Sequence, residues 1–406
     1  MIKRCFMQDE SSHISSLVGS DAGVKYSKSE QRPKCGEYFD FHHIEIWVSN
    51  AFQAKMFYET HLGFKCVAYA GLETGEKNFT AYVLQGEQAY IVVKSPLNPN
   101  DEIIAPFVKK HGDAVRDVAF CVENVQKTFE HAKASGAEVI QPPTFSEDDK
   151  GQVLIASVLA YGDTVHSFIQ RDQYRGLFLP GYQPIDPHLV NTFAESLPPV
   201  PMGRIDHVVA NQPQGKMNEV VDFYTNSLCF RRFWSVDDKL LQTGTSGLNS
   251  IVVSDFDERI KIPVNQPSTR FDGRSQTQEF VDFHGCGGIQ HIAICVGNLE
   301  QTVKSLKARG CYVLPVPGAY YDELQSALSE NDLDLGISVD TMRELDIVVD
   351  YDDKGFILQI FTRPVESRPT LFFEFMQRNN HDGFGAGNFK SLFSAIEAQQ
   401  KLRGTL

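Results

Sequence analysis

The sequence predicts an α+β fold made of two related modules, each with a predominantly antiparallel, strongly curved sheet. Three observations support this prediction. Segments recur in the same order, with FHHIEIWV around His43 matching RIDHVVAN around His207, and FYETHLGF matching FYTNSLCF. Apolar runs rich in β-branched residues are typical of strands. The segment before the second FY pair, MNEVVDFYTNSL, spaces its apolar residues by three and four, as an amphipathic helix does.

The strands expected within each module follow this pattern. In the first module they cover residues 41–48, 119–122 and 165–170, and in the second they cover residues 205–209, 292–296 and 356–362. The last strand of each module follows a turn rich in Asp and Gly, YGDT or YDDKG, which is a hairpin signal. Each module therefore predicts a strand–helix–strand order that ends in a hairpin.

The end of the chain predicts a helix that covers a site. In NFKSLFSAIEAQQKLRG, Asn388 is a plausible N-cap, and one helical face carries Phe389, Leu392, Phe393 and Ile396. The preceding GFGAGNF resembles a phosphate-binding loop only weakly, because it has no GK[ST] pattern and no Rossmann unit. A flexible loop leading into a lid helix, which could exclude water from a reactive site, is the better interpretation.

The domain organisation follows from changes in composition. Residues 1–36 are rich in Ser, Lys, Gly and Glu with little periodicity, and we expect a flexible tail. Residues 37–182 form the first module, which we expect to lack an intact metal site. Residues 183–203 contain five prolines and predict a linker. Residues 204–406 form the second module, including the lid helix.

Composition and charge exclude several classes of partner. The 406-residue chain carries a formal net charge of −14, which disfavours nucleic acid and anionic membranes as partners. Its eight cysteines are scattered without a CxxC motif, as expected in a reducing compartment. No apolar run is long enough to span a bilayer, and the N-terminal residues lack the apolar core of a secretory signal. These features predict a cytoplasmic protein.

Three ionisable residues on apolar segments of the second module suggest a metal site. His207 and His291 occupy equivalent places in the repeat, and Glu374 is flanked by phenylalanines in TLFFEFMQ. A buried carboxylate must be paired, protonated or bound to metal. Two imidazoles and one carboxylate are the usual ligands of non-haem Fe(II) with open positions. A lone histidine on an apolar strand is, however, usually a hydrogen-bonded core residue, so from the residues alone both interpretations stay open.

The first module lacks this set. Its matching places hold His43, Asp117 and Pro180, the last because GLFLP aligns with TLFFE. Proline offers no donor atom. The sequence therefore predicts one working metal site in the second module and a catalytically silent first module.

Polar residues on apolar strands suggest a pocket beside the metal. Gln359 and Phe361 share one strand face by the period-two rule, and Ser250 and Asn265 are further candidates. Each could equally be a hydrogen-bonded turn or sheet-edge residue. Gln290 directly precedes His291, so both can serve one site only if the strand contains a bulge or bend.

Many motifs in order resemble one family. RIDHVV, GLNSIVV, IPVNQP, GIQHIA, VVDYDDKG, ILQIFTRP, RPTLFFE and QRNNHDGFGAGNF are similar to 4-hydroxyphenylpyruvate dioxygenases, and the similarity covers roughly residues 38–404. That family belongs to the vicinal oxygen chelate superfamily, whose paired βαβββ modules form half-open barrels. The resemblance implies this fold, with a C-terminal helix over the active site.

The resemblance also implies roles for individual residues. It implies Fe(II) as the cofactor, bound by His207, His291 and Glu374. It implies catalytic roles for three glutamines, Gln276, Gln290 and Gln359. It implies a substrate-binding set of Ser250, Asn265, Phe361, Phe384, Asn388 and Phe389, with Phe361 and Phe389 stacking on the substrate ring and with Pro263 and Phe372 supporting the pocket.

The implied activity is the conversion of 4-hydroxyphenylpyruvate and O2 to homogentisate and CO2 in tyrosine catabolism, by a homodimer. Two alternatives stay open: a hydroxymandelate synthase-like dioxygenase, and a non-catalytic small-molecule binding protein of the same fold. The departures from the family pattern are modest. Cys286 stands where a small residue is usual, Val348 stands where Leu is common, and Gln266 replaces a usual Glu.

Overall fold

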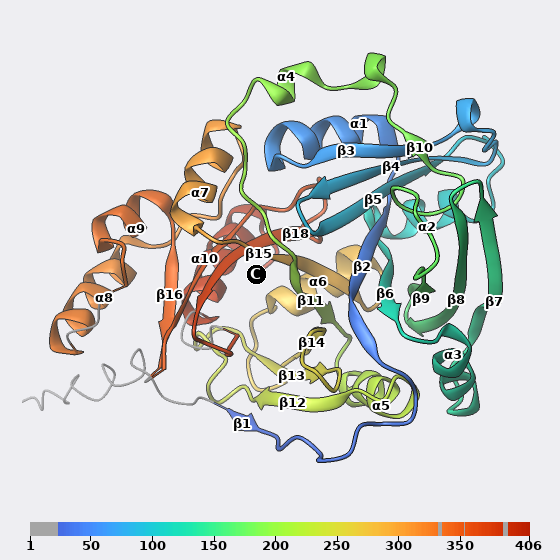
Figure 1. Ribbon diagram of the computed structural model, residues 1–406. Coiled ribbons are helices and arrows are strands. Elements are labelled where there is room, and N and C mark those ends of the chain that lie inside the picture. The colour runs from blue at the N-terminus through green and yellow to red at the C-terminus, as the bar shows by residue number, and fades with distance from the viewer. Residues whose placement is uncertain (1–22, 332–334, 353, 385–388) are drawn as a thin grey trace, which may run out of the picture.

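The computed structural model describes residues 23–331, 335–352, 354–384 and 389–406 (Figure 1). Within these residues the chain forms two nine-stranded sheets. One hydrophobic core runs through both domains. Phe120 of the first domain packs edge-on against Tyr38 of the same domain and, at a tilt, against Phe230 of the second domain. The α+β prediction is therefore confirmed.

The first sheet has the strand order β10-β3-β4-β5-β2-β6-β9-β8-β7. Its strands are β2 (Tyr38–Trp47), β3 (Lys65–Ala70), β4 (Phe79–Gly86), β5 (Ala89–Pro96), β6 (Ala114–Val122), β7 (Val139–Asp148), β8 (Gly151–Tyr161), β9 (Thr164–Gln170) and β10 (Gln183–Pro184). Its helices are α1 (Ala51–Phe57), α2 (Ile104–His111) and α3 (Val125–Ala134).

The second sheet has the order β1-β12-β13-β14-β11-β15-β18-β17-β16. Its strands are β1 (Val24–Lys25), β11 (Ile205–Asn211), β12 (Arg231–Val236), β13 (Leu248–Ser254), β14 (Lys261–Pro267), β15 (Gly288–Cys295), β16 (Val348–Tyr351), β17 (Phe356–Phe361) and β18 (Phe372–Asn379). The helices that follow in this half are α5 (Met217–Ser227), α6 (Gln276–His284), α7 (Leu299–Ala308), α8 (Gly318–Asn331), α9 (Val339–Leu345) and α10 (Phe389–Arg403).

Each sheet consists of two βαβββ modules joined through their first strands. In the second domain, β11 pairs parallel with β14 and β15 pairs parallel with β18, while β11 and β15 run antiparallel to each other. The first domain repeats this pattern with β2, β5, β6 and β9. The paired modules predicted from the family resemblance are thus present. The antiparallel centre places the first strands of both modules side by side.

Helix starts repeat as well. The side chain of Asn124 caps α3 by accepting a hydrogen bond from the Lys127 N–H, and Asn298 caps α7 in the same way through the Gln301 N–H. The sequences VEN and VGN, which connect the preceding strands to these helices, therefore encode the same strand-to-helix turn in both domains.

Residues 23–36 correct the prediction of a flexible tail over residues 1–36. β1 pairs antiparallel with β12, and the Arg32 guanidinium forms an ion pair with Asp257 at 2.8 Å. The Cys35 side chain is buried. The physical reason is that β12 would otherwise expose an unpaired row of backbone N–H and C=O groups, which β1 partly covers. Residues 1–22 lie outside the described residues.

The proline-rich connection between the domains is held by one arginine. Residues 183–203 include β10, which pairs with β3, and the short helix α4 (Thr192–Glu195). The buried Arg309, which follows α7, donates hydrogen bonds from its guanidinium to five backbone carbonyls, those of Glu59, Thr60, Ala194, Leu197 and Pro198. Arg309 therefore joins the connection to both domains.

The alignment of Pro180 with Glu374 is wrong. β6 pairs in parallel with β9, as β15 does with β18. Asp117 of β6 lies opposite Val165 of β9, and His291 of β15 lies opposite Phe372 of β18. Two residues further along, Ser167 of β9 is the counterpart of Glu374. Strand pairing overrides the local match of GLFLP with TLFFE, because Pro180 lies outside the strands of the sheet.

Among the described residues, no helix combines the length and apolar character needed to cross a bilayer.

We expect Arg309→Met to lower the free energy of unfolding by about 3 kcal/mol, because the carbonyls lose charged hydrogen bonds while the aliphatic stem is kept. Urea denaturation measures this change. Arg343→Met is the matched control, because Arg343 is exposed where it pairs with Asp322, and its loss should cost less than about 1 kcal/mol. Equal costs for the two variants would contradict the role of Arg309.

We expect Asp117→Asn to flatten the pH dependence of stability. Burial is the main cause that raises the pKa of Asp117 to about 7, and the hydrogen bonds from Ser167 oppose it. The folded state thus binds this proton more tightly than the unfolded chain does, so stability falls as pH rises from about 4 through about 7. Each unit by which the pKa of Asp117 differs between the folded and unfolded states corresponds to at most about 1.4 kcal/mol of unfolding free energy. The urea midpoint of unfolding, measured between pH 4 and 8, should change less in Asp117→Asn than in the parent protein. Equal changes in the two proteins would contradict this expectation.

Candidate metal centre

Three neighbouring strands bring His207, His291 and Glu374 together. β11, β15 and β18 are consecutive in the sheet, and each contributes one buried ligand. The Nε2 atoms of His207 and His291 lie 3.4 and 3.3 Å from Oε2 of Glu374. The residues on which the sequence predicted a metal site therefore form one cluster.

Two register irregularities fix the orientation of the histidines. Between β11 and β15 the pairing shifts between Ile205 and His207 and again between Val209 and Ala210, which leaves Asp206 and Gln290 as the extra residues. Such bulges re-aim side chains. The carboxylate of Asp206 lies 2.9 Å from Nδ1 of His207, and the amide oxygen of Gln290 lies 3.3 Å from Nδ1 of His291. The bulge that Gln290 required is present.

These contacts determine which ring nitrogen carries the proton. A carboxylate or amide oxygen accepts a hydrogen bond, so Nδ1 of each histidine donates. Nε2 then donates to Glu374 when the ring is protonated and presents a lone pair when the ring is neutral. Both Nε2 atoms then face the Glu374 carboxylate, whose other oxygen accepts a 2.7 Å hydrogen bond from the Gln359 amide. Two nitrogen lone pairs and a carboxylate directed at one point form a donor set that fits a cation.

The charge of Asp206 is balanced away from the cluster. The Arg378 guanidinium makes two hydrogen bonds of 2.9 Å to its carboxylate. The same guanidinium donates to the carbonyls of His381 and Gly383. Arg378 thus links the orientation of His207 to the segment that follows β18.

Electrostatics favour an ionised carboxylate. Burial alone would raise the pKa of Glu374, but hydrogen bonds from His207 and His291 outweigh it and lower the pKa to about 2. Burial lowers the pKa of His291. For His207, burial acts in the same direction, but hydrogen bonds to Asp206 and Glu374 outweigh it and raise the pKa. The cluster is therefore anionic at its carboxylate, as a metal ligand must be.

The cluster opens onto a cavity between the strands of the second sheet and α10. Its wall is mainly apolar, with a few polar groups. Beyond the three ligands, the lining consists of Val209, Trp234, Ser250, Val252, Pro263, Asn265, Gln359, Phe361, Phe384 and Leu392. The edge of Phe384 packs against His207, and its ring stacks on Trp234.

Most predicted pocket residues line this cavity, but two glutamines do not. Gln276 and Gln290 line a neighbouring cavity of about 570 Å³, and the Gln290 amide donates to Gln276 at 3.3 Å. Phe372 also lines that second cavity and stacks on His291. The structure thus places Gln276 and Gln290 behind His291.

Two other predicted residues lie partly or wholly outside the described part of the chain. Asn388 is outside it, as is most of the GFGAGNF segment. Phe389 begins α10, but its side chain is not described. Leu392 of α10 does line the cavity, which agrees with a terminal helix over the site.

Sequence reasoning missed Asp206, Arg378 and Trp234. Asp206 carries the only available signal, because an acidic residue beside a histidine on an apolar strand needs a partner when buried. Its bulge could not be read from the sequence, and Arg378 and Trp234 reach the site only through the tertiary fold.

The counterpart positions of the first domain hold different chemistry. Nδ1 of His43 contacts Nδ1 of His42 at 2.7 Å, and the Asp117 carboxylate accepts hydrogen bonds from the Ser167 backbone and hydroxyl. Burial lowers the pKa of His43 to about 3. In the part of the chain that is described, these side chains form no converging set of three ligands.

Comparison with known proteins agrees with this architecture. A family model, Glyoxalase/Bleomycin resistance protein/Dioxygenase superfamily, matches residues 40–156 and 204–333. Among solved structures, a triple mutant of 4-hydroxymandelate synthase from Streptomyces coelicolor has a TM-score of 0.77 at 29% identity, covering 89% of this chain and 99% of that one.

Curated relatives extend the similarity over nearly the whole chain. The 4-hydroxyphenylpyruvate dioxygenase of Xenopus tropicalis is 44% identical, covering 94% of this chain and 97% of that protein. The enzyme of the same name from Danio rerio is 45% identical, covering 94% and 96%. That from Dictyostelium discoideum is 44% identical, covering 90% and 99%. With its paired modules and its histidine–histidine–carboxylate cluster, the chain belongs to the 4-hydroxyphenylpyruvate dioxygenase family of the glyoxalase/dioxygenase superfamily.

Proposed function

We propose that this protein is an Fe(II)-dependent 4-hydroxyphenylpyruvate dioxygenase, which converts 4-hydroxyphenylpyruvate and O2 to homogentisate and CO2 in tyrosine catabolism. The observation that carries this proposal is the cluster of His207, His291 and Glu374 at the wall of a largely apolar cavity. Two imidazoles and one carboxylate on one side of a metal suit Fe(II) and leave positions open for substrate and oxygen.

The donor set determines how the substrate binds. Fe(II) held by His207, His291 and Glu374 would supply the oxygen chemistry and a binding position for the 2-oxo acid end of the substrate. The protein fixes the ring in place and keeps water out. Phe361, Phe384 and Leu392 offer apolar surface for the ring. The 2-oxo acid therefore points toward Glu374 and the ring points away from it.

The polar residues orient the far end of the substrate. Ser250 and Asn265 lie directly opposite each other on β13 and β14 and both line the cavity. The Asn265 amide donates to Asn211 at 3.3 Å, which limits its rotation and leaves its carbonyl oxygen to accept the phenol hydroxyl. These contacts would distinguish a para-hydroxylated ring from an unsubstituted one.

The three glutamines act on the ligands. Gln359 donates to Glu374 and holds the carboxylate oxygen that does not face the histidines. Gln290 fixes the Nδ1 proton of His291, and Gln276 in turn accepts from Gln290. Gln276 and Gln290 are therefore proposed as positioning residues that support catalysis through His291.

The second candidate is a hydroxymandelate synthase activity, favoured by the similarity in fold to such an enzyme. Both activities use the same substrate and donor set, so the product decides. We expect protein loaded anaerobically with Fe(II), then given O2 and 4-hydroxyphenylpyruvate, to form homogentisate. Chromatography with mass spectrometry identifies it. Hydroxymandelate as the product would favour the second candidate, and no oxygen uptake by iron-loaded protein would favour a binding protein.

A cytoplasmic location and a homodimeric state stay predictions from the sequence. Light scattering of the full chain after size-exclusion chromatography tests the homodimer.

We expect His291→Ala to lower Fe(II) affinity more than about 100-fold and to abolish turnover, because two ligands cannot hold the metal in facial geometry. Iron analysis and oxygen uptake measure these effects, and circular dichroism reports the fold. His43→Ala is the control, at the first-domain strand position that corresponds to His207 of the cluster. It should keep about one iron per chain and nearly full activity. An active, iron-replete His291→Ala protein would disprove the assignment of this ligand.

We expect truncation before Phe384 to leave iron binding intact but to consume more oxygen per homogentisate formed. The removed segment includes Leu392, which lines the cavity, and Glu397, which accepts hydrogen bonds of 2.6 Å from Thr243 and Ser246. Without it, water reaches the site.

The ratio of oxygen uptake to homogentisate measures this coupling. Leu392→Ala should shift it in the same direction, whereas Leu402→Ala, at an exposed position of the same helix, should not. Full coupling in the truncated protein would show that α10 has a purely structural role.

A further inference from the structure

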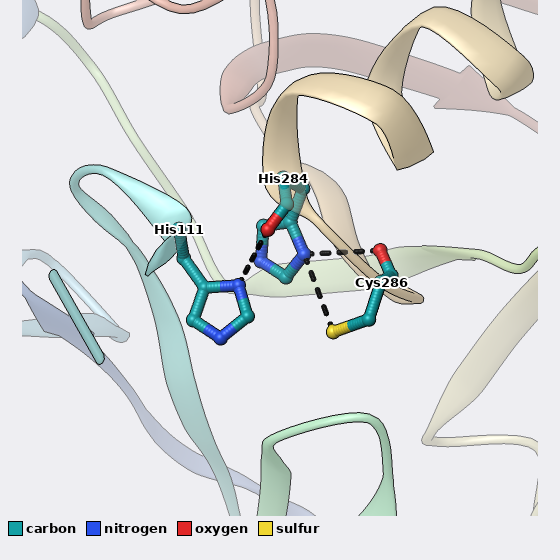
Figure 2. Close-up of side chains that lie close together, drawn as sticks. All are labelled: His111, His284 and Cys286. Carbon is teal, nitrogen blue, oxygen red and sulfur yellow. Dashed lines mark hydrogen bonds between the residues drawn. The ribbon is translucent and has the colours of Figure 1, made fainter. Parts of the chain in front are cut away.

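Two cysteines with histidine neighbours lie where the domains meet, and their surroundings differ. Figure 2 shows the first, Cys286, beside His284. Its sulfur lies 3.9 Å from Nδ1 of that ring, but Nδ1 already donates to the Cys286 carbonyl at 3.1 Å. The thiol itself donates to the Gly287 carbonyl at 3.2 Å, and burial raises its pKa. Cys286 is therefore a protonated thiol, and such thiols react slowly.

The second cysteine, Cys229, accepts a hydrogen bond instead. Nε2 of His131, on α3 of the first domain, lies 3.1 Å from the Cys229 sulfur and 3.0 Å from the carbonyl oxygen of Asn226. A carbonyl oxygen only accepts, so Nε2 carries the hydrogen and shares it between that oxygen and the sulfur. A hydrogen bond to sulfur stabilises the thiolate form of a cysteine.

A second thiol, that of Cys35, lies beside Cys229. The Cys35 sulfur is 3.9 Å from the carbonyl oxygen of Leu228, and the two thiols are hydrogen-bond partners. The hydroxyl of Thr128, on α3, donates to the Cys35 carbonyl at 3.0 Å. Thr128 and His131 lie on neighbouring turns of one helix face, so α3 positions both cysteines.

The two thiols differ in acidity and in exposure. Hydrogen bonding from Cys35 is the main cause that lowers the pKa of Cys229 to about 7, His131 acts in the same direction, and burial opposes them. The same hydrogen bond, together with burial, raises the pKa of Cys35. Near neutral pH, Cys229 is thus partly a thiolate and Cys35 is a thiol that donates to it. Cys229 is partly exposed whereas Cys35 is only 2% exposed, so Cys229 is the sulfur that a dissolved oxidant meets first.

We propose that Cys35 and Cys229 form a redox-active pair, which hydrogen peroxide oxidises to a disulfide that links the segment before β2 to the second domain. The Cys229 thiolate attacks one peroxide oxygen, the O–O bond breaks, and Cys229 becomes a sulfenic acid while hydroxide leaves.

Cys35 then completes the oxidation. Its sulfur attacks the sulfur of Cys229, the S–O bond breaks, and the thiol proton of Cys35 joins the departing hydroxide to form water. The two sulfurs together lose two electrons. Peroxide is reduced to two waters, because the first hydroxide takes a proton from solvent.

The disulfide would join elements of both domains. Cys35 precedes β2, the central strand of the first sheet. Cys229 precedes β12, which carries Trp234 at the wall of the cavity. Oxidation would therefore fix the start of β12 relative to the first domain, at a place distinct from the His207–His291–Glu374 cluster.

Peroxide treatment of the reduced full-length protein tests the proposal. Remaining thiols are blocked with iodoacetamide, and unreduced peptides are identified by mass spectrometry. We expect a Cys35–Cys229 linked peptide that dithiothreitol removes. In Cys35→Ser, Cys229 should accumulate as a sulfenic acid that dimedone traps, whereas Cys229→Ser should give neither product. His131→Ala should slow linking about 3- to 10-fold near neutral pH, because Cys229 loses a donor.

Two variants are matched controls. Cys286→Ser removes the other cysteine beside a histidine, and His61→Ala removes a histidine that contacts a different carbonyl, that of Arg309 at 3.0 Å. Both should form the linked peptide at the rate of the parent protein. Glu374→Ala should do so as well, which separates this reaction from the proposed iron site.

Circular dichroism verifies that each variant is folded. No linked peptide in the peroxide-treated parent would overturn the proposal. So would dimedone labelling of Cys35 in Cys229→Ser at the level of Cys229 in Cys35→Ser, or linking at the parent rate in His131→Ala.

Discussion

The burial of the Glu374 carboxylate between two imidazoles is the constraint on which the architecture of the second domain depends. An isolated buried carboxylate costs several kcal/mol, so the fold must supply partners from every side. It does so because three adjacent strands each contribute one ligand, while Gln359 on the fourth strand binds the remaining oxygen. These side chains lie at the same position along the three strands because β11 pairs antiparallel with β15 and β15 pairs parallel with β18.

The two bulges orient the His207 and His291 side chains in a way that regular strands could not. In a regular strand, Asp206 and His207 would point to opposite faces, as would Gln290 and His291. The register shifts let each preceding residue accept a hydrogen bond from its histidine, which sets the tautomer and the aim of Nε2. Through Arg378 the first of these contacts extends to the carbonyls of His381 and Gly383, the latter next to Phe384, which lines the cavity.

The first domain shows what the duplicated fold becomes without a ligand set. Its strand pairing is nearly the same, yet Asp117 and Ser167 satisfy each other by hydrogen bonding, and His43 contacts His42. The first domain also contacts the second through the carbonyls that Arg309 binds and through the hydrogen bond of His111 with the His284 carbonyl. These contacts support the elements that precede the strands carrying the cluster.

From local patterns alone, the sequence predicted the duplication, the strands that carry the repeated motifs, the terminal helix and the candidate cluster of His207, His291 and Glu374, because repeated apolar patterns and a carboxylate among phenylalanines are local signals. Tertiary structure decided the rest. The counterpart of Glu374 is Ser167 and not Pro180, since strand pairing, which no local alignment contains, sets the equivalence. Gln276 and Gln290 lie behind His291, and residues 23–36 pack along the second sheet, because bulges and sheet edges arise only when distant strands meet.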